Sequence, residues 1–230
     1  MGKTMNREDL IQASKDLPIF SGIKAEDIQS AFGCVGAFNK KYHRGEYIIL
    51  SEESVKSVGV VLSGKVQMIQ EDLWGNKAVL LTMGEKELFG ESFACGSKIV
   101  SSVSFVAIEE TNALFLPFER VMHTCMHGCQ HHHRLIVNMV ALIAEKNALF
   151  IQKIEIMSKK SLREKIFAYL LFQASNNDSK YFTIPLGRVQ LSEYLNVDRS
   201  ALTRELNNMR DEGFIDFDKN TFRILRELEF

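Results

Sequence analysis

The chain has 230 residues, of which 46% are hydrophobic and 25% charged, and this length can bury one or two full cores. No stretch approaches the ~18 uninterrupted apolar residues of a membrane span, and the polar residues 1–9 are unlike a secretory signal. Four cysteines in a chain of this length do not make a disulfide scaffold, and a formal net charge of −1 does not by itself suggest a polyanion-binding protein. We therefore expect a cytoplasmic protein without membrane association.

The N-terminal half is typical of a small β-domain. An amphipathic helical opening and a turn at residues 17–22 lead to a second predicted helix over residues 25–32. Short β-rich runs then alternate with glycines, which is the pattern of a sandwich or barrel. The predicted strands cover residues 38–42, 47–50, 58–62, 66–69, 78–83 and 103–108. Such a β-roll could hold a small ligand, although most small barrels are filled by side chains.

Residues 121–134 contain five histidines and two cysteines. On one continuous helix they would form two rows, namely Cys125, Cys129 and His133, and His123, His127 and His131. Thiolate and imidazole ligands suit zinc, iron or copper, but residues i and i+8 lie ~12 Å apart, so one helix offers two ligands to one metal. We favour a half-buried helix whose cysteines pack as small hydrophobes while its histidines face water. A metal, haem or redox site over residues 123–133 is the alternative.

A long helix is predicted between the two halves of the chain. One residue in every three or four belongs to a seam formed by Ile136, Val140, Ile143, Asn147, Phe150, Ile154 and Met157. A helix packed on its own β-roll could show such a stripe. A seam of this length with one polar residue, Asn147, instead favours a parallel coiled coil in which the Asn sets the register, so we predict a homodimer. A polar hinge at residues 158–160 follows, and Ser161 with Glu164 forms a capping box that opens the next helix.

Residues 198–213 are predicted to form a helix with an exposed polar face. Asp198 is a plausible N-cap whose carboxylate can accept the first backbone N–H groups, and Gly213 ends the helix as a left-handed C′ residue. The apolar stripe consists of Leu202, Leu206 and Met209, and the opposite side holds Arg199, Ser200, Thr203, Arg204 and Asn207. A short helix over residues 189–195 precedes it across a turn at 196–197, as in a helix-turn-helix. The pattern predicts DNA binding; an ordinary solvated surface helix is the alternative.

The flanking segments support a winged helix. Residues 214–225 alternate in polarity on both sides of a polar turn at 218–220, which predicts a β-hairpin directly after the helix. Residues 181–185 form one further short strand. Charge is local as well, since residues 158–204 hold eight Lys or Arg and four Asp or Glu, so a modest basic module belongs to an otherwise acidic chain.

In this order, the segments resemble the CRP/FNR superfamily of bacterial transcription regulators. The resemblance covers roughly residues 8–225 and rests on residues 17–22, 62–66, 89–92, 103–107, 109–111 and 198–213. It implies an α+β fold with a cupin-like, cyclic-nucleotide-binding-like β-roll over residues 1–118, connecting and dimerisation helices over 119–158, and a winged helix-turn-helix over 159–230. It also implies a homodimer that binds a two-fold symmetric operator in double-stranded DNA, with RNA polymerase as a partner.

The resemblance also indicates what the effector is not. In the cyclic-AMP-binding members, a Gly-Glu pair is followed by an Arg that pairs with the cyclic phosphate. Gly90 and Glu91 match that pair, but residues 99–105 contain no Arg, and a buried phosphodiester without a cationic partner is heavily penalised. We therefore expect an effector other than cyclic AMP, of unknown identity. The tentative pocket comprises Phe89, Gly90, Glu91, Ser92, Ser101, Ser102, Asn147, Phe150 and Ile151.

Two further functions find no match in the sequence. The oxygen-sensing members hold an iron–sulfur cluster on N-terminal cysteines, whereas no cysteine precedes Cys34 here. The chain also contains no glycine-rich phosphate loop, no H-E-x-x-H and no nucleophile elbow, so we expect no enzyme activity.

The register of the family's recognition helix assigns the DNA contacts. The residues expected at base edges are Arg199, Ser200 and Arg204, with Thr203 and Asn207 at the margin, and those expected at phosphates are Arg188 and Gln190. Ser200 stands where relatives carry a Glu that can accept from cytosine, so the half-site should differ at that base pair. A surface ion pair of Arg204 with Glu205 or Glu193 is the alternative role of that side chain.

Overall fold

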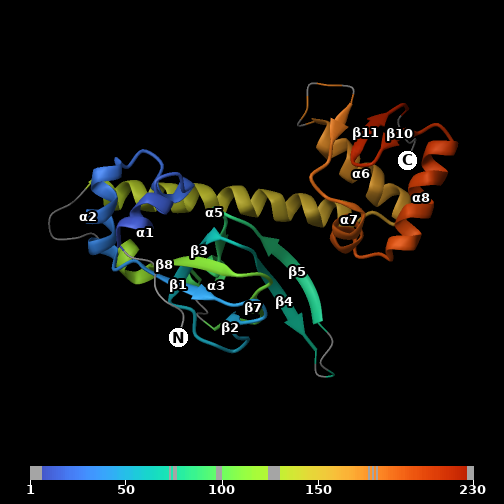
Figure 1. The fold of residues 1–230 in the computed structure, drawn as a ribbon. Coiled ribbons are helices and arrows are strands. Elements are labelled where there is room, and N and C mark those ends of the chain that lie inside the picture. The colour runs from blue at the N-terminus through green and yellow to red at the C-terminus, as the bar shows by residue number, and fades with distance from the viewer. Residues whose placement is uncertain are drawn as a thin grey trace. The chain divides into compact units, whose positions relative to one another are not determined.

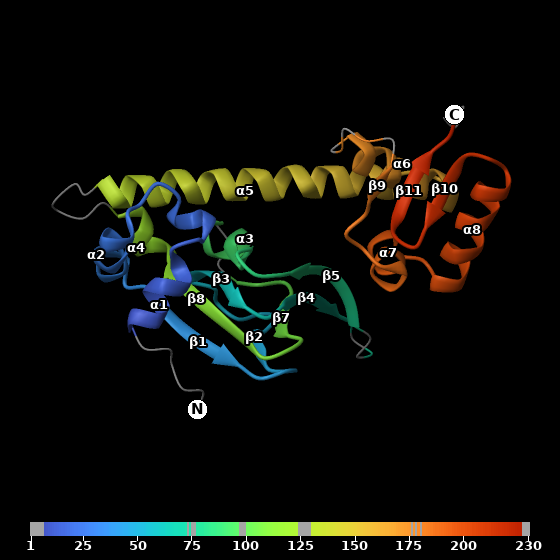
Figure 2. The same ribbon diagram turned by 45° about the horizontal axis from the view of Figure 1, so that its top comes forward.

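The computed structural model describes residues 7–72, 74, 77–96, 100–123, 130–175, 177, 179 and 181–226. The chain divides into two compact units, Met1–Glu145 and Lys146–Phe230, which we describe separately. The first is built around β-sheets and the second around helices with a small sheet (Figures 1 and 2). This α+β architecture, with a β-domain followed by a long helix and a helix-turn-helix, confirms the predicted fold class.

The first unit contains two four-stranded antiparallel sheets. One has the order β1-β8-β3-β6 and the other β2-β7-β4-β5. The strands are β1 (Phe38–Tyr42), β2 (Tyr47–Ile49), β3 (Ser57–Ser63), β4 (Val66–Glu71), β5 (Lys77–Met83), β6 (Leu88–Phe89), β7 (Ser104–Ala107) and β8 (Thr111–Pro117). Buried residues of both sheets belong to one hydrophobic core, in which the rings of Phe89 and Phe105 are 5.8 Å apart. The interior of the roll is thus packed with side chains.

Five helical elements accompany these sheets in the first unit. They are α1 (Arg7–Ser14), the 3-10 turn η1 (Pro18–Phe20), α2 (Ala25–Val35), α3 (Glu91–Ala94) and α4 (Phe118–Met122). The buried side chains of η1 and α2, among them Phe20 and Phe32, extend the core of the sheets. The beginning of the long helix α5 (Gln130–Met157) also packs here through Leu135 and Met139, which are almost completely buried.

The prediction missed strand β8, which lies between β1 and β3 in its sheet. Six of its seven residues are buried, so its side chains are enclosed on both faces of the sheet. The alternation of polar and apolar residues that reveals a half-exposed strand is therefore absent from it. The two-residue strand β6 was missed as well, because it is too short for any periodicity.

The second unit follows the predicted order of elements. After the end of α5 come α6 (Leu162–Ser175), β9 (Phe182–Thr183), α7 (Arg188–Leu195), α8 (Arg199–Asp211), β10 (Ile215–Asp218) and β11 (Thr221–Ile224). The three strands form one antiparallel sheet in the order β10-β11-β9. Leu191, Leu202, Leu206 and Phe222 are completely buried in a separate core. The α7–α8 pair followed by a hairpin is the expected winged helix-turn-helix.

The ends of the helices in this unit depend on local side chains and turns. The hydroxyl of Ser161 accepts the backbone N–H of Glu164, as the predicted capping box requires, whereas the Glu164 carboxylate accepts the backbone N–H of Lys160 and not that of Ser161. After α8, the N–H of Gly213 donates to the carbonyl of Arg210 and that of Phe214 to Met209, a Schellman motif with Gly213 at φ +74°. Asp198 does occupy the N-cap of α8, but its side chain makes no cap hydrogen bond, contrary to expectation.

Candidate nucleic-acid interface

The helix α8 presents one buried and one exposed face. Leu202, Leu206 and Met209 lie in the core of the second unit without solvent exposure. Four of the five predicted base-reading residues are exposed, namely Arg199, Ser200, Thr203 and Arg204, and Asn207 is half-buried. The hydroxyl of Thr203 donates to the carbonyl of Arg199 within the helix. The face that could enter a DNA groove is therefore available and carries two cations.

The acidic neighbour of Arg204 is already bound by another cation. Glu205 accepts a hydrogen bond from Nε of Arg163 at 2.6 Å, and no ion pair joins Arg204 to any described residue. The other acid considered, Glu193, is exposed on α7 and likewise makes no ion pair with Arg204. The guanidinium of Arg204 is therefore not neutralised on the described surface, which favours a DNA contact over a structural ion pair.

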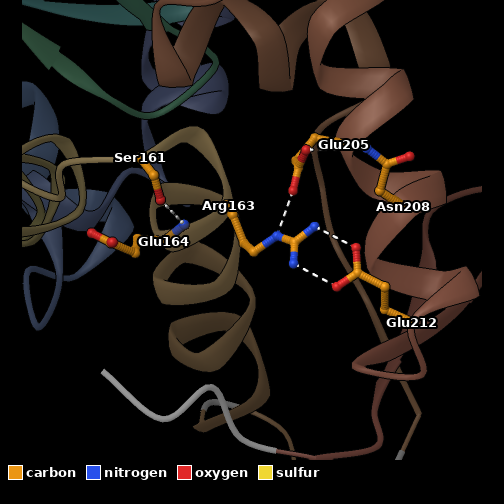
Figure 3. A network of polar contacts seen from close by, with 6 residues as sticks. All are labelled: Ser161, Arg163, Glu164, Glu205, Asn208 and Glu212. Carbon is orange, nitrogen blue, oxygen red and sulfur yellow. Dashed lines mark hydrogen bonds and ion pairs between the residues drawn. The ribbon is translucent and has the colours of Figure 1, made fainter.

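Arg163, on the first turn of α6, holds α8 at two points (Figure 3). Besides Glu205, it contacts Glu212 at the C-cap of α8 through Nη1 at 2.6 Å and Nη2 at 2.8 Å. This two-bond contact lowers the pKa of Glu212 and raises that of Arg163. The guanidinium also lies 5.8 Å from the ring of Phe214. The sequence did not suggest this network, because the partners are 42 and 49 residues apart along the chain.

The two residues predicted to hold phosphates have intramolecular contacts at the start of α7. Oε1 of Gln190 accepts the backbone N–H of Gly187 at 3.0 Å and so closes the first turn of the helix. Nη2 of Arg188 donates to the backbone carbonyl of Lys219 in the hairpin turn at 2.8 Å. Burial lowers the pKa of Arg188. Neither contact was foreseen, and the phosphate assignments stay predictions.

The long helix α5 has an exposed apolar stripe that shares three positions with the predicted seam. At three other positions the stripe is shifted by one residue toward the C-terminus. Ile136 and Ile143 pack against the core of the first unit. The exposed residues at spacings of three and four are instead Val137, Val140, Ala144, Asn147, Ile151 and Ile154. Val140, Ile151 and Ile154 are 60%, 61% and 68% exposed. By length and composition alone, α5 could also cross a membrane over His131–Met157, but this criterion by itself is weak evidence.

The residues predicted to line the effector pocket belong to two different units. In the first unit, Phe89 is completely buried against Gly59, whose missing side chain gives the ring its space. Gly90 has φ +75°, a left-handed conformation that glycine adopts without strain, and it starts the short helix that carries the buried Glu91. The burial of Cys95, and then the nearby charge of Glu91, raise the pKa of that thiol to about 11, so Cys95 is not a reactive thiolate at neutral pH.

The other members of the effector set lie in less enclosed places. Ser101 is buried and its hydroxyl donates to the carbonyl of Val103, whereas Ser92 and Ser102 are exposed. Asn147 and Ile151 are exposed and Phe150 is half-buried on the part of α5 that belongs to the second unit. Lys98, the nearest cation to this set in the sequence, lies outside the described residues.

The Cys/His segment is not one continuous helix. α4 ends at Met122, His123 follows with an extended backbone, and α5 begins at Gln130. Cys125 and Cys129 lie outside the described residues, and His133 is exposed. No group of three His, Cys, Asp or Glu that could hold a metal occurs in the described part of the chain.

Two histidines of this segment have structural contacts instead. Nε2 of His132, which is 3% exposed, donates to the carbonyl of Arg120 in α4 at 2.8 Å. His131 lies 3.6 Å from a carboxylate oxygen of Asp27 in α2. We expected these histidines to face water, and the burial of His132 corrects that expectation, because its ring fixes the start of α5 against α4.

Comparisons with known proteins agree with this arrangement. A family model of the cyclic nucleotide-binding domain matches residues 39–127, and one of the Crp-like helix-turn-helix domain matches residues 164–228. The chain is 24% identical to the cyclic AMP receptor protein of Thermus thermophilus over 91% of this chain and 93% of that protein.

Solved structures show the same fold. The c-di-GMP responsive global regulator CLP of Xanthomonas campestris has a TM-score of 0.61 and 14% identity, over 89% of this chain and 100% of the other. CprK, solved in complex with OCPA, has a TM-score of 0.65 and 15% identity, over 86% and 91% of the two chains.

Proposed function

Because the chain belongs to the CRP/FNR superfamily of DNA-binding transcription regulators, we propose that it acts as a homodimer on a two-fold symmetric operator. The single observation that supports this mode of binding is the exposed face of α8, on which Arg199 and Arg204 are free of ion pairs with described residues. A helix of this kind reads one half-site in the major groove, and a dimer reads two. The place of action is then the cytoplasm, where the DNA is.

The exposed stripe of α5 supports the dimer. Val137, Val140, Ala144, Asn147, Ile151 and Ile154 follow a heptad spacing over two and a half repeats and are not covered within the chain. Pairing with the same stripe of a second copy would bury the apolar side chains and leave Asn147 opposite Asn147, which sets the register of a parallel pair. Dimerisation thus explains the apolar surface of this helix without a membrane.

The effector is proposed to be a small molecule other than cyclic AMP. The inner surface of the roll carries the aromatic rings of Phe89, Phe105 and Phe115, with neighbouring centroids 5.8 Å apart. A cyclic phosphate would need a cation in this region, and the strand segment 100–107 provides none. RNA polymerase is the partner that a regulator of this family would address once it is bound to its operator.

Operator selection from random DNA tests the reading of sequence by α8. With the wild-type protein we expect a two-fold symmetric consensus; with Arg204→Ala we expect the preference for one base pair per half-site to be lost, at a cost of ~1–3 kcal/mol. Arg223→Ala, which removes a cation from the wing strand β11 rather than from α8, should keep the same consensus. Identical base preferences for wild type and Arg204→Ala would contradict the assignment.

A further inference from the structure

The side chain of Arg188 connects the first helix of the helix-turn-helix to the wing, the hairpin β10–β11. Its Nη2 donates to the carbonyl of Lys219 at 2.8 Å, and its guanidinium lies 5.0 Å from the ring of Phe217 and 5.2 Å from that of Phe222. Nη1 is buried and has no partner among the described residues. All of these contacts lie within the second unit, so Arg188 is packed inside the winged domain and not extended into solvent.

The wing has a reason to need such a contact. Asp218 pairs with Thr221 in the hairpin register, which leaves a two-residue turn at Lys219 and Asn220. Lys219 adopts φ +50° there, a left-handed conformation that is unfavourable for residues other than Gly and Asn. A disfavoured backbone persists only where its surroundings hold it. The hydrogen bond from Arg188 reaches the carbonyl of this very residue.

The turn carries one cation and one acid, so its position decides which of the two charges would lie near a DNA phosphate. Lys219 is exposed at the tip, directly beside the exposed carboxylate of Asp218. A loosely held turn would bring the acid toward a phosphate as readily as the cation. A fixed turn can place the ammonium group of Lys219 on the DNA backbone and keep Asp218 away from it.

We propose that Arg188 is a positioning residue that locks the wing to α7, so that Lys219 meets a backbone phosphate of the operator in a fixed place. This rests on the proposed mode of operator binding. Arg188 itself is then not the phosphate ligand that its position in the sequence predicts, because one of its terminal nitrogens is bound to a carbonyl and the other is buried. The lowering of its pKa by burial agrees with this enclosed place.

The variant Arg188→Lys separates the two roles. A lysine keeps the charge, so it would preserve most of a phosphate contact, but it has no planar group that could lie against the two rings and donate to the carbonyl from a fork. Arg210→Lys is the matched control, since the Arg210 guanidinium also lies 5.0 Å from the Phe217 ring. Its one ion pair among the described residues is an exposed contact with Asp211, and it has no hydrogen bond to the wing backbone.

The first measurement uses the full-length protein without DNA, by hydrogen exchange of the backbone amides in the second unit. We expect the amides of residues 218–221 to exchange at least about tenfold faster in Arg188→Lys, which corresponds to the loss of one charge-assisted hydrogen bond, while the buried amides of α8 are unchanged. Arg210→Lys should behave like the wild type. Equal exchange of the wing in Arg188→Lys and wild type would overturn the lock, whether or not the protein binds the proposed operator.

The second measurement is the salt dependence of binding to the selected operator, at a temperature where all variants are folded. Lys219→Ala should lower the slope of log K against log salt by about 0.9 for each half-site, the effect of one phosphate. Arg188→Lys should lower it equally, and the double variant should lower it no further, because both changes remove the same contact. A wild-type slope in either single variant would refute the wing contact. So would a double variant whose decrease in slope equals the sum of the decreases in the two single variants. If no variant and no wild-type protein binds a symmetric operator, the proposed function fails while the exchange result for the lock stands.

Discussion

At the scale of single residues, Arg163 joins α6 to α8 through hydrogen bonds. It contributes three hydrogen bonds to two carboxylates of that helix, and its side chain is 29% exposed. Removing the guanidinium leaves Glu205 without its strongest partner and beside Arg204. We therefore regard Arg163 as a residue that keeps the acids of α8 away from the DNA-binding face and leaves its cations free.

The Arg163 network should respond to acid. Because the pKa of Glu212 is lowered below its usual 4.5 in the folded protein, its contribution to stability is fully present above about pH 4.5 and is lost as the pH falls through the lowered value. We expect Arg163→Gln to lower the melting temperature of the protein at pH 7 and to lower it progressively less toward pH 3. Lys165→Gln removes a cation from the same helix without an ion pair to a described residue and should show no such trend. A pH-independent difference for Arg163→Gln would contradict the role of Glu212.

Two glycines should respond to alanine in opposite directions. Gly213 has φ +74° and no atom within 4 Å of the position of a new Cβ, so Gly213→Ala should destabilise by about 1 kcal/mol through backbone strain alone. Gly33 lies inside α2, also with open space around it, so Gly33→Ala should stabilise by roughly 0.5–1 kcal/mol. Denaturant titration of each unit's transition measures both effects, and the same sign for both would contradict this account.

At the scale of elements, α5 has one face that packs within the chain and another that is exposed. Its beginning uses Leu135, Ile136, Met139 and Ile143 to pack on the first unit, and another face of the helix carries the exposed stripe described above. The predicted seam mixed both sets, because a heptad pattern alone does not tell which face a neighbouring sheet will cover. Ile143 is therefore a poor probe of dimerisation, since an acid there would also damage the core.

The exposed stripe provides a cleaner test of the dimer. We expect Val140→Asp with Ile154→Asp to give folded monomers, because the charges would be buried in the pair of helices but remain in water in the monomer. Leu149→Asp is the control, since Leu149 is 58% exposed but lies about 200° around the helix from Asn147. Sedimentation at micromolar concentration measures the state of each variant. Monomeric wild-type protein, or equal dissociation by the control, would contradict the proposed interface.

At the scale of the whole molecule, the chain is nearly neutral, but its two units differ in net charge. The unit Lys146–Phe230 holds fourteen Lys or Arg against twelve Asp or Glu, and the remaining 145 residues hold fourteen against seventeen. Two of the twelve acids, Glu205 and Glu212, are bound by Arg163. A slightly basic DNA-binding unit is thus joined to an acidic one, which confines electrostatic attraction to the operator.

The first unit is the part of the chain that we propose binds the effector. We expect calorimetric titration with cyclic AMP to show no saturable binding in the micromolar range, because residues 99–105 contain no Arg that could pair with the cyclic phosphate. The cyclic AMP receptor protein of Thermus thermophilus is a suitable positive control for the titration. Micromolar binding at one site per subunit would overturn this prediction.

The sequence by itself determined the order of most elements, the fold class and the faces of α8. These features rest on local signals, namely helical periodicity, glycine at a left-handed helix end, and a capping box, and each of them acts over a few residues. Only the tertiary structure decided that β8 completes its sheet, that His132 is buried against α4, that Arg163 binds Glu205 and Glu212, and that Arg188 turns toward the wing. The side-chain contacts join residues 12 to 49 positions apart, and β8 is enclosed on both faces, so neither feature leaves a periodic trace in the chain. Contacts between residues so far apart in the sequence depend on how the elements pack, and no local sequence pattern shows this.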